Sequence, residues 1–236
     1  MSIAENVAQI KTNIAKAAIA AGRDPKGILL CAATKMNGAD AVRQAIAAGV
    51  DCCGENRVQE LTAKLAENAY EGAPVHFIGR LQTNKVKQVV GTVSLIHSVD
   101  RLNLLEAIQK EAAKQGIVQD ILLQVNIGHE DSKGGFWEDE LMQLIPEMSK
   151  FPNVRVRGLM TIPPICENSI ENDKFFQKMY HLSVDISEKK YDNVSIDIMS
   201  MGMSDDYISA IRFGSTMIRV GTAIFGARNY TPSHQA

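Results

Sequence analysis

The chain has 236 residues, with 45% hydrophobic and 22% charged side chains, which are values of an ordinary globular protein and exclude a disordered or fibrous chain. A formal net charge of −2 gives no electrostatic basis for binding nucleic acid. No apolar run approaches the roughly 20 residues that span a bilayer, so no membrane partner is expected. The N-terminus also lacks the basic flank and apolar stretch of a signal peptide.

The first 22 residues predict a helix. Val7, Ile10 and Ile14 recur at helical spacing, and Gly22 follows as a stop signal. We expect this helix to cover the bottom of the main fold, the alternative being a contact in a dimer.

Eight short runs of β-type residues follow, beginning near residues 28, 51, 75, 93, 120, 155, 194 and 217. Each gap between them has room for a loop and a helix. Leu102, Leu105 and Ile108 mark one such helix, with Asp100 expected as its N-cap and Gly116 as its end.

Strands that alternate with helices predict parallel pairing and right-handed crossovers. Eight such units predict a closed (β/α)₈ TIM barrel, which uses about 250 residues. An open doubly wound sheet is the alternative. No linker divides the sequence, so we expect a single domain over 1–236, with the N-terminal helix as an addition and 229–236 as a tail.

The four cysteines are Cys31, Cys52, Cys53 and Cys166. Their spacing contains no CxxC motif, so it predicts neither a disulfide framework nor a zinc site. We expect reduced thiols in the core and a cytoplasmic protein.

In barrels of this kind the reactive groups lie where strands end. Lys35 closes the first apolar strand. It is either a surface lysine or an amine held inside the barrel mouth, and an amine in a barrel mouth can form a Schiff base. Such a lysine indicates either an aldolase or a pyridoxal phosphate (PLP) site.

The last two loops favour a phosphate site, which barrels often build after strands seven and eight. Ser200-Met201-Gly202 and Gly221-Thr222 each supply a hydroxyl, backbone N–H groups and a glycine that permits close approach.

Arg219 is the only charge between Met217 and Val220, and strand alternation places it opposite Ile218 and Val220. A buried guanidinium without a partner is costly. The sequence leaves two interpretations open: an ion pair across the barrel to Asp197 or Glu55, or a donor to a ligand at the barrel centre.

Together these residues closely resemble the pyridoxal phosphate homeostasis protein family, whose members are related to the barrel domain of bacterial alanine racemase. The matching segments occur in order over nearly the whole chain: ATK (33–35), GENRVQE (54–60), HFIGRLQTNK (76–85), SVDR (98–101), VNI (125–127), SKGG (132–135), RGLMTIPP (157–164), MSMGMSDD (199–206) and GSTMIRVGTAIFGAR (214–228). Thr34, Asn37-Gly38 and Arg57 depart from residues often found in the family, which leaves details of the entrance unassigned.

The resemblance implies PLP held as an internal aldimine on Lys35. It places the phosphate against Ser200, Gly221 and Thr222, and Arg219 against the pyridine nitrogen. It places Asn56 and Met201 along the ring. His76 and Asn84 also match the family pattern, with structural roles expected, and Lys133 is expected in a loop near the mouth.

Three functions stay open. The first is a PLP-binding protein of cofactor homeostasis that hands PLP to apo-enzymes, with little or no turnover and as a monomer. The second is a PLP-dependent amino-acid racemase. Racemases take a second acid/base from a C-terminal domain of a partner subunit, and few residues follow Ala227 here. The third is a Schiff-base aldolase without PLP.

Overall fold

The structure, a computed structural model, describes residues 1–130, 132–164 and 169–226. Cys166 and the expected tail 229–236 lie outside the described residues. Within the described ranges no helix is both long and apolar enough to cross a membrane.

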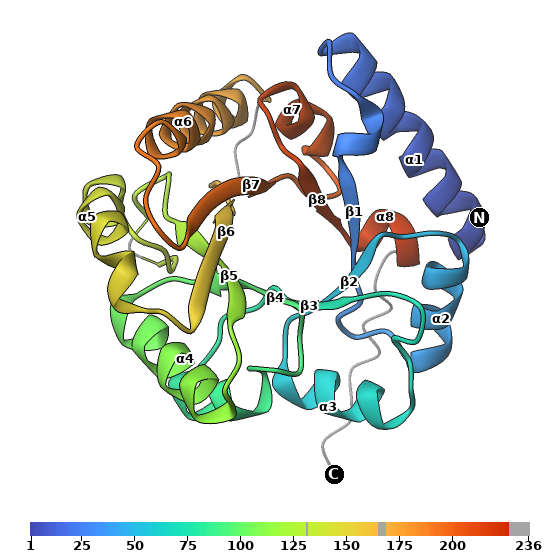
Figure 1. Cartoon of the computed structure of the whole chain (residues 1–236). Helices are drawn as coiled ribbons and strands as arrows, with labels where there is room; N and C mark the ends of the chain where they lie inside the picture. The colour runs from blue at the N-terminus through green and yellow to red at the C-terminus, as the bar shows by residue number, and fades with distance from the viewer. Residues whose placement is uncertain (131, 165–168, 227–236) are drawn as a thin grey trace.

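The strands form a closed parallel barrel in which each strand pairs with its neighbours in the sequence and β8 pairs with β1 (Figure 1). This confirms the predicted barrel against the open-sheet alternative. Each predicted run begins within two residues of the start of one strand: β1 Leu29–Ala33, β2 Cys52–Glu55, β3 Val75–Phe77, β4 Leu95–Val99, β5 Gln119–Val125, β6 Val154–Thr161, β7 Val194–Ser200 and β8 Met217–Val220.

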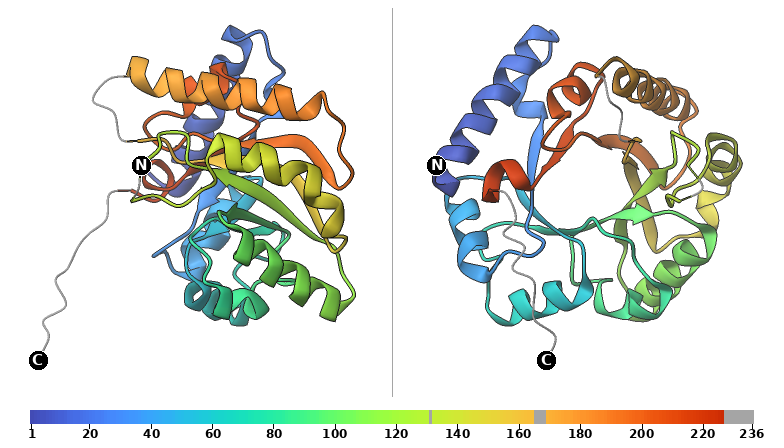
Figure 2. Two further views of the ribbon diagram at one scale, coloured as in Figure 1. Left: turned by 90° about the vertical axis from the view of Figure 1, so that its left-hand side faces the viewer. Right: turned by 180° about the vertical axis from the view of Figure 1, so that it is seen from behind.

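Helices surround the barrel as an outer ring (Figures 1 and 2). The shortest predicted gap, between β3 and β4, holds a 3₁₀ helix rather than an α-helix. The α-helices are α1 Ile3–Ala20, α2 Ala39–Ala47, α3 Val58–Ala66, α4 Leu102–Gln115, α5 Glu138–Leu144, α6 Ser169–Ser187, α7 Tyr207–Arg212 and α8 Thr222–Phe225, and the 3₁₀ helices are η1 Pro25–Gly27, η2 Thr83–Gln88 and η3 Ile145–Lys150.

The N-terminal helix belongs to this outer ring, so the expectation that it covers an end of the barrel is wrong. α1 packs against α2, α7 and α8, and the centre of the barrel is free of it from both sides (Figures 1 and 2). Asn6 Nδ2 donates to the Ile224 carbonyl at 2.9 Å, and Asn13 Nδ2 donates to the Tyr207 hydroxyl at 3.1 Å. The physical reason is that α8 has only four residues and leaves apolar surface beside β8 that α1 covers.

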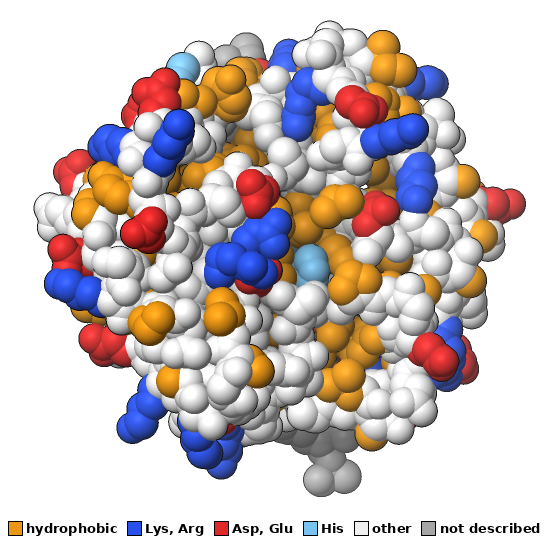
Figure 3. All heavy atoms as spheres, in the orientation of Figure 1, with side chains coloured by type: hydrophobic (Ala, Val, Ile, Leu, Met, Phe, Trp, Pro, Cys, Tyr) orange, Lys and Arg blue, Asp and Glu red, His pale blue; other side chains and the backbone are white. Residues whose placement is uncertain are grey.

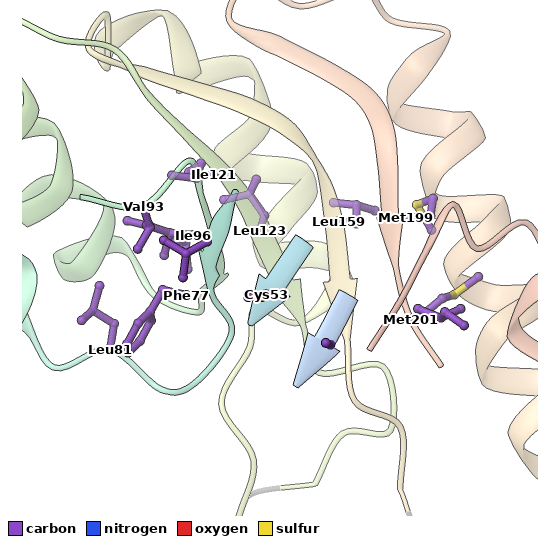
Figure 4. Packing of buried hydrophobic residues seen from close by; sticks show 14 of the residues in the cluster. Cys53, Phe77, Leu81, Val93, Ile96, Ile121, Leu123, Leu159, Met199 and Met201 are labelled. Carbon is purple, nitrogen blue, oxygen red and sulfur yellow. The ribbon is translucent and has the colours of Figure 1, made fainter. Parts of the chain in front are cut away.

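Alternation along the strands divides the core into two parts. Outward-facing residues such as Cys53, Ile218 and Val220 pack against the helices, whereas Cys31, Cys52 and their inward-facing neighbours fill the barrel. Figure 4 shows part of the outer layer between strands and helices.

Gly158 marks an irregular register between β6 and β7. Its φ of +151° lies in a region that side chains disfavour, and an added Cβ would lie 1.8 Å from the Ile198 carbonyl oxygen. Glycine therefore lets the two strands approach closely and bend around the barrel.

The predicted end of α4 is confirmed, because Gly116 takes a left-handed φ of +67°. The predicted start is wrong by one residue, since Arg101 is the N-cap. The reason is that the Asp100 carboxylate pairs with Arg101 and reaches Arg80 at 3.9 Å instead of capping the helix.

Candidate functional site

A cavity of about 390 Å³ opens at the end of the barrel where the strands finish, which is the side shown on the right of Figure 2. It collects residues from the ends of six strands and the loops that follow them. The described wall consists of Ala33, Lys35, Met36, Asn37, Asn56, Ile78, Ile162, Met203, Ser204, Asp205, Arg219, Gly221, Thr222, Phe225 and Gly226. The structure thus brings Lys35, Asn56, Arg219, Gly221 and Thr222 together, as the sequence analysis placed them.

A buried network fixes the backbone just before Lys35. Glu55 is fully buried on the outward face of β2, and its Oε1 accepts from Thr34 Oγ1 at 2.5 Å, Lys64 Nζ at 2.5 Å and Tyr70 OH at 2.8 Å. Lys64 Nζ also donates to the Thr34 carbonyl at 2.7 Å. Burial and the neighbouring Glu55 carboxylate raise the pKa of Tyr70, so its hydroxyl stays a donor. Lys35 therefore extends from a rigid strand end into the cavity.

Arg219 forms part of the cavity floor and is 5% exposed. Its Nη1 donates to Ser200 Oγ at 2.6 Å and to the Ser200 carbonyl at 2.7 Å, and its Nη2 donates to the Thr161 carbonyl at 2.9 Å. Burial lowers the pKa of Arg219 to about 10, which still leaves it protonated at neutral pH.

The ion pair considered for Arg219 in the sequence analysis is absent among the described contacts. Glu55 faces outward from β2 toward Lys64. Asp197 lies in the middle of β7, where its half-exposed carboxylate pairs with Arg157 at 3.1 Å. Strand direction and side-chain alternation keep both carboxylates away from Arg219, and neutral acceptors take their place.

Two buried histidines continue the polar contacts beneath Arg219. His97 Nδ1 lies 3.0 Å from Ser200 Oγ, and His97 Nε2 lies 3.0 Å from His76 Nδ1. Burial lowers the pKa of His76 to about 4, and burial with the nearby His76 and Arg219 lowers that of His97 well below its usual range. Both imidazoles are therefore neutral at pH 7, and neither is part of the described cavity wall.

Asn56 follows β2, and its backbone lies directly against the loop after β3. An added Cβ on Gly79 would lie 2.1 Å from the Asn56 carbonyl oxygen, so glycine is required for this approach. The Asn56 Oδ1 atom is buried and has no hydrogen-bond partner among the described residues. A buried acceptor of this kind is costly unless a ligand or water satisfies it.

Two predicted site residues have their side chains outside the cavity wall. Ser200 is 1% exposed, and its hydroxyl is already engaged by Arg219 and His97. Met201 is fully buried in the layer between strands and helices, next to Met199 (Figure 4). The alternation of side chains continues one residue past the end of β7, so Ser200 and Met201 point to opposite faces of the barrel wall.

Three further residues from the sequence motifs lie outside this cavity. Arg57 and Asn84 line a second, more open cavity beside α3 and η2. Lys133 Nζ forms an ion pair with Glu130 at 2.5 Å and donates to the Pro163 carbonyl at 3.0 Å.

Four residues that no sequence pattern marked individually also line the cavity: Ile162, Met203, Ser204 and Asp205. Three of them lie in the segment MSMGMSDD (199–206), so the resemblance to the family already indicated the loop after β7, although not these residues. Ser204 Oγ accepts from the Ala223 N–H at 3.4 Å, which joins this loop to α8.

Comparisons with known proteins identify the family of this chain. Residues 5–229 match the model of the family described as alanine racemase, N-terminal domain. A pyridoxal phosphate homeostasis protein of Aquifex aeolicus is 43% identical over 230 residues, which are 98% of this chain and 100% of that protein.

Two solved structures share the fold. PipY of Synechococcus elongatus, with PLP bound, superposes with a TM-score of 0.83 at 33% identity and covers 95% of this chain and 100% of its own. An alanine racemase of Clostridium difficile has a TM-score of 0.69 at 16% identity, covering 96% of this chain and 58% of its own. The racemase shares the fold alone, while the matches over full length show that the chain belongs to the alanine racemase N-terminal domain family and, within it, to the pyridoxal phosphate homeostasis proteins.

Proposed function

We propose that this protein binds PLP in the cavity at the barrel mouth and takes part in PLP homeostasis and delivery, with little or no catalytic turnover. The observation that carries the proposal is the convergence of Lys35, Asn56, Arg219, Gly221 and Thr222 on one cavity. The names of full-length relatives and the PLP bound to PipY support the choice of ligand.

The residues of the cavity fit the chemical groups of PLP. Lys35 would hold the cofactor covalently, because its Nζ and the aldehyde carbon of PLP form an imine with loss of one water. The orphaned Oδ1 of Asn56 would accept a hydrogen bond from the ring hydroxyl. Gly221, Thr222 and Ser204, at the junction of the last two loops, would contact the phosphate. Ser200 would act through Arg219 rather than on the phosphate.

Arg219 supports a role without turnover. Its burial lowers its pKa only to about 10, so at neutral pH it remains a donor. A pyridine nitrogen facing it must then accept and stay unprotonated. The chemistry that PLP supplies is withdrawal of electrons into its ring, and an unprotonated ring withdraws them weakly. Arg219 therefore favours retention of the cofactor over reactions of amino acids.

Apo-enzymes that need PLP are the proposed partners, and the cytoplasm is the proposed location. Cys31, Cys52 and Cys53 are buried and unpaired, as expected for a reducing compartment. We propose that the chain acts as a monomer and as one domain, since the N-terminal helix already packs on its own barrel.

Borohydride reduction tests the covalent assignment. Purified protein should be yellow, and reduction should fix PLP irreversibly on Lys35, as peptide mass spectrometry would show. Lys35→Ala should lose the adduct, while Lys133→Ala, which removes a second lysine near the mouth, should retain it. An adduct that persists in Lys35→Ala would contradict the proposal. A colourless protein whose lysine is trapped only with a carbonyl substrate would indicate the aldolase instead.

The racemase remains the alternative, because its fold is shared. Racemization needs acid/base groups on both faces of the substrate. Lys35 and Asp205 are the amine and the carboxylate of the described cavity wall, so they are the candidate acid/base groups. Exchange of the Cα hydrogen of amino acids with solvent deuterium separates the two functions. We expect exchange no faster than with free PLP, and rapid exchange by the wild type that is lost in Asp205→Asn would establish the racemase.

A further inference from the structure

Two thiols and one imidazole meet inside the barrel, below the cavity. Cys31 of β1 and Cys52 of β2 are paired in register, and His76 lies on the adjoining β3. One ligand atom of each of the three lies within 4.8 Å of the others. All three are buried, and the two cysteines are free thiols. Sequence spacing did not predict this cluster, because barrel closure brings the residues together.

A neighbouring side chain prepares the imidazole for coordination. His97 Nε2 lies 3.0 Å from His76 Nδ1, so Nδ1 is engaged and Nε2 is left as the coordinating atom. Histidine ligands of metals commonly have their second nitrogen held in this way, which fixes the orientation of the ring.

We propose that Cys31, Cys52 and His76 form a binding site for a soft divalent cation, with Zn²⁺ as the natural occupant. Bond lengths of about 2.0–2.3 Å place ligand atoms roughly 3.5–3.8 Å apart in a tetrahedral zinc site, so small side-chain rotations close the observed cluster. The fourth position would take a water molecule.

The thiol ligands favour a soft ion such as Zn²⁺. Leu95, Leu122 and Met160 pack around the cysteines, and the buried Arg219 is paired in register with Cys31 on the neighbouring strand. Zn²⁺ binds as the two thiols lose their protons to solvent, giving two thiolates, one neutral imidazole and a complex of zero net charge.

The cation can approach from the end opposite the PLP cavity. Figure 3 views the barrel from the end where the strands begin and shows a hollow at its centre, with apolar side chains and a histidine in it. His76 is 7% exposed, whereas Cys31 and Cys52 are 0% and 2% exposed. His76 is thus the most exposed of the three ligands.

Cobalt substitution tests the site in the full chain freed of PLP. Co²⁺ bound to thiolates gives an intense ligand-to-metal absorption, and we expect it to saturate at one Co²⁺ per chain and to disappear when one equivalent of Zn²⁺ is added. All variants carry Cys166→Ala, so that the fourth cysteine contributes no thiol. Absence of the absorption in this background would overturn the proposal.

Cys53 provides a matched control, since it is adjacent to Cys52 but faces the helices. Cys52→Ala and His76→Gln should each weaken Co²⁺ binding at least tenfold, while Cys53→Ala should bind as tightly as the parent. Equal loss in Cys52→Ala and Cys53→Ala would contradict the site. Because a core variant can fold poorly, the melting temperature with and without Zn²⁺ serves as a second readout: Zn²⁺ should raise it in the parent and in Cys53→Ala only.

Lys35→Ala separates this inference from the proposed function. The variant should lose PLP and still bind one Co²⁺, because Lys35 is no part of the cluster. Loss of Co²⁺ binding in Lys35→Ala would place the metal at the cavity and overturn the interior site.

Discussion

Arg219 donates to the hydroxyl of Ser200 over 2.6 Å, and this contact holds the guanidinium at the cavity floor. The serine in turn lies 3.0 Å from His97 Nδ1. The orientation of the cation that faces the cavity thus depends on a side chain that does not itself line the cavity.

Ser200→Ala should therefore weaken PLP binding about tenfold, as expected for the loss of one hydrogen bond to a charged group. Ser215→Ala is the matched control, because Ser215 Oγ is also buried and donates to the Met201 carbonyl at 2.7 Å. Titration of the PLP absorbance measures both affinities. Equal weakening in the two variants would show a general effect of losing a buried hydroxyl.

Asn56→Ala should lower PLP affinity by a similar factor with little change in the melting temperature of the PLP-free protein. The reason is that Asn56 Oδ1 has no partner among the described residues, so the free protein loses no bond there. Asn126→Ala should instead lower the melting temperature of the PLP-free protein, with little change in PLP affinity. The reason is that Asn126 Nδ2 donates to the carbonyls of Glu130 at 2.9 Å and Lys133 at 3.2 Å. A large fall in the melting temperature of PLP-free Asn56→Ala would contradict the prediction that Asn56 serves PLP binding rather than stability.

Lys64→Met should reduce the free energy of unfolding by about 3–5 kcal/mol, because it leaves the buried Glu55 carboxylate without its cation. The double variant Glu55→Gln, Lys64→Met should recover much of this loss. Urea denaturation measures both. Asp40→Ala, which removes an exposed ion pair with Arg43, should change stability by no more than about 1 kcal/mol.

Burial raises the pKa of Asp206 above its ordinary 3.8, against opposing effects from the Met203 N–H and Arg219. As pH rises above 3.8, the unfolded chain loses this proton before the folded chain does. The unfolding free energy should therefore fall through this window and then level off once the folded carboxyl ionizes. Asp206→Asn keeps an acceptor for Met203 and should lack this component, whereas Asp205→Asn, which removes only one of the smaller causes of the raised pKa, should retain most of it. Urea denaturation of the PLP-free protein from pH 3.5 to 7 provides the comparison, and identical profiles for wild type and Asp206→Asn would refute it.

Local patterns in the sequence identified the strands and several of the cavity residues. Short apolar runs of β-type residues mark where each strand lies, and alternation correctly turns Arg219 inward between Ile218 and Val220. The polar residues at strand ends, among them Lys35 and Gly221, then fall at one end of the barrel because all strands are parallel.

The contacts between residues of distant strands could be identified only from the tertiary structure. Periodicity gives the face of a residue, but strand register and barrel closure decide which inward residues touch. Those two factors direct Arg219 to Ser200 and Thr161 rather than to Glu55 or Asp197. They also place α1 beside the barrel. The sequence by itself determined a parallel barrel with Lys35 at its mouth, and only the closed structure decided that Cys31, Cys52 and His76 meet inside it, since each pair of neighbours lies more than 20 residues apart in the chain.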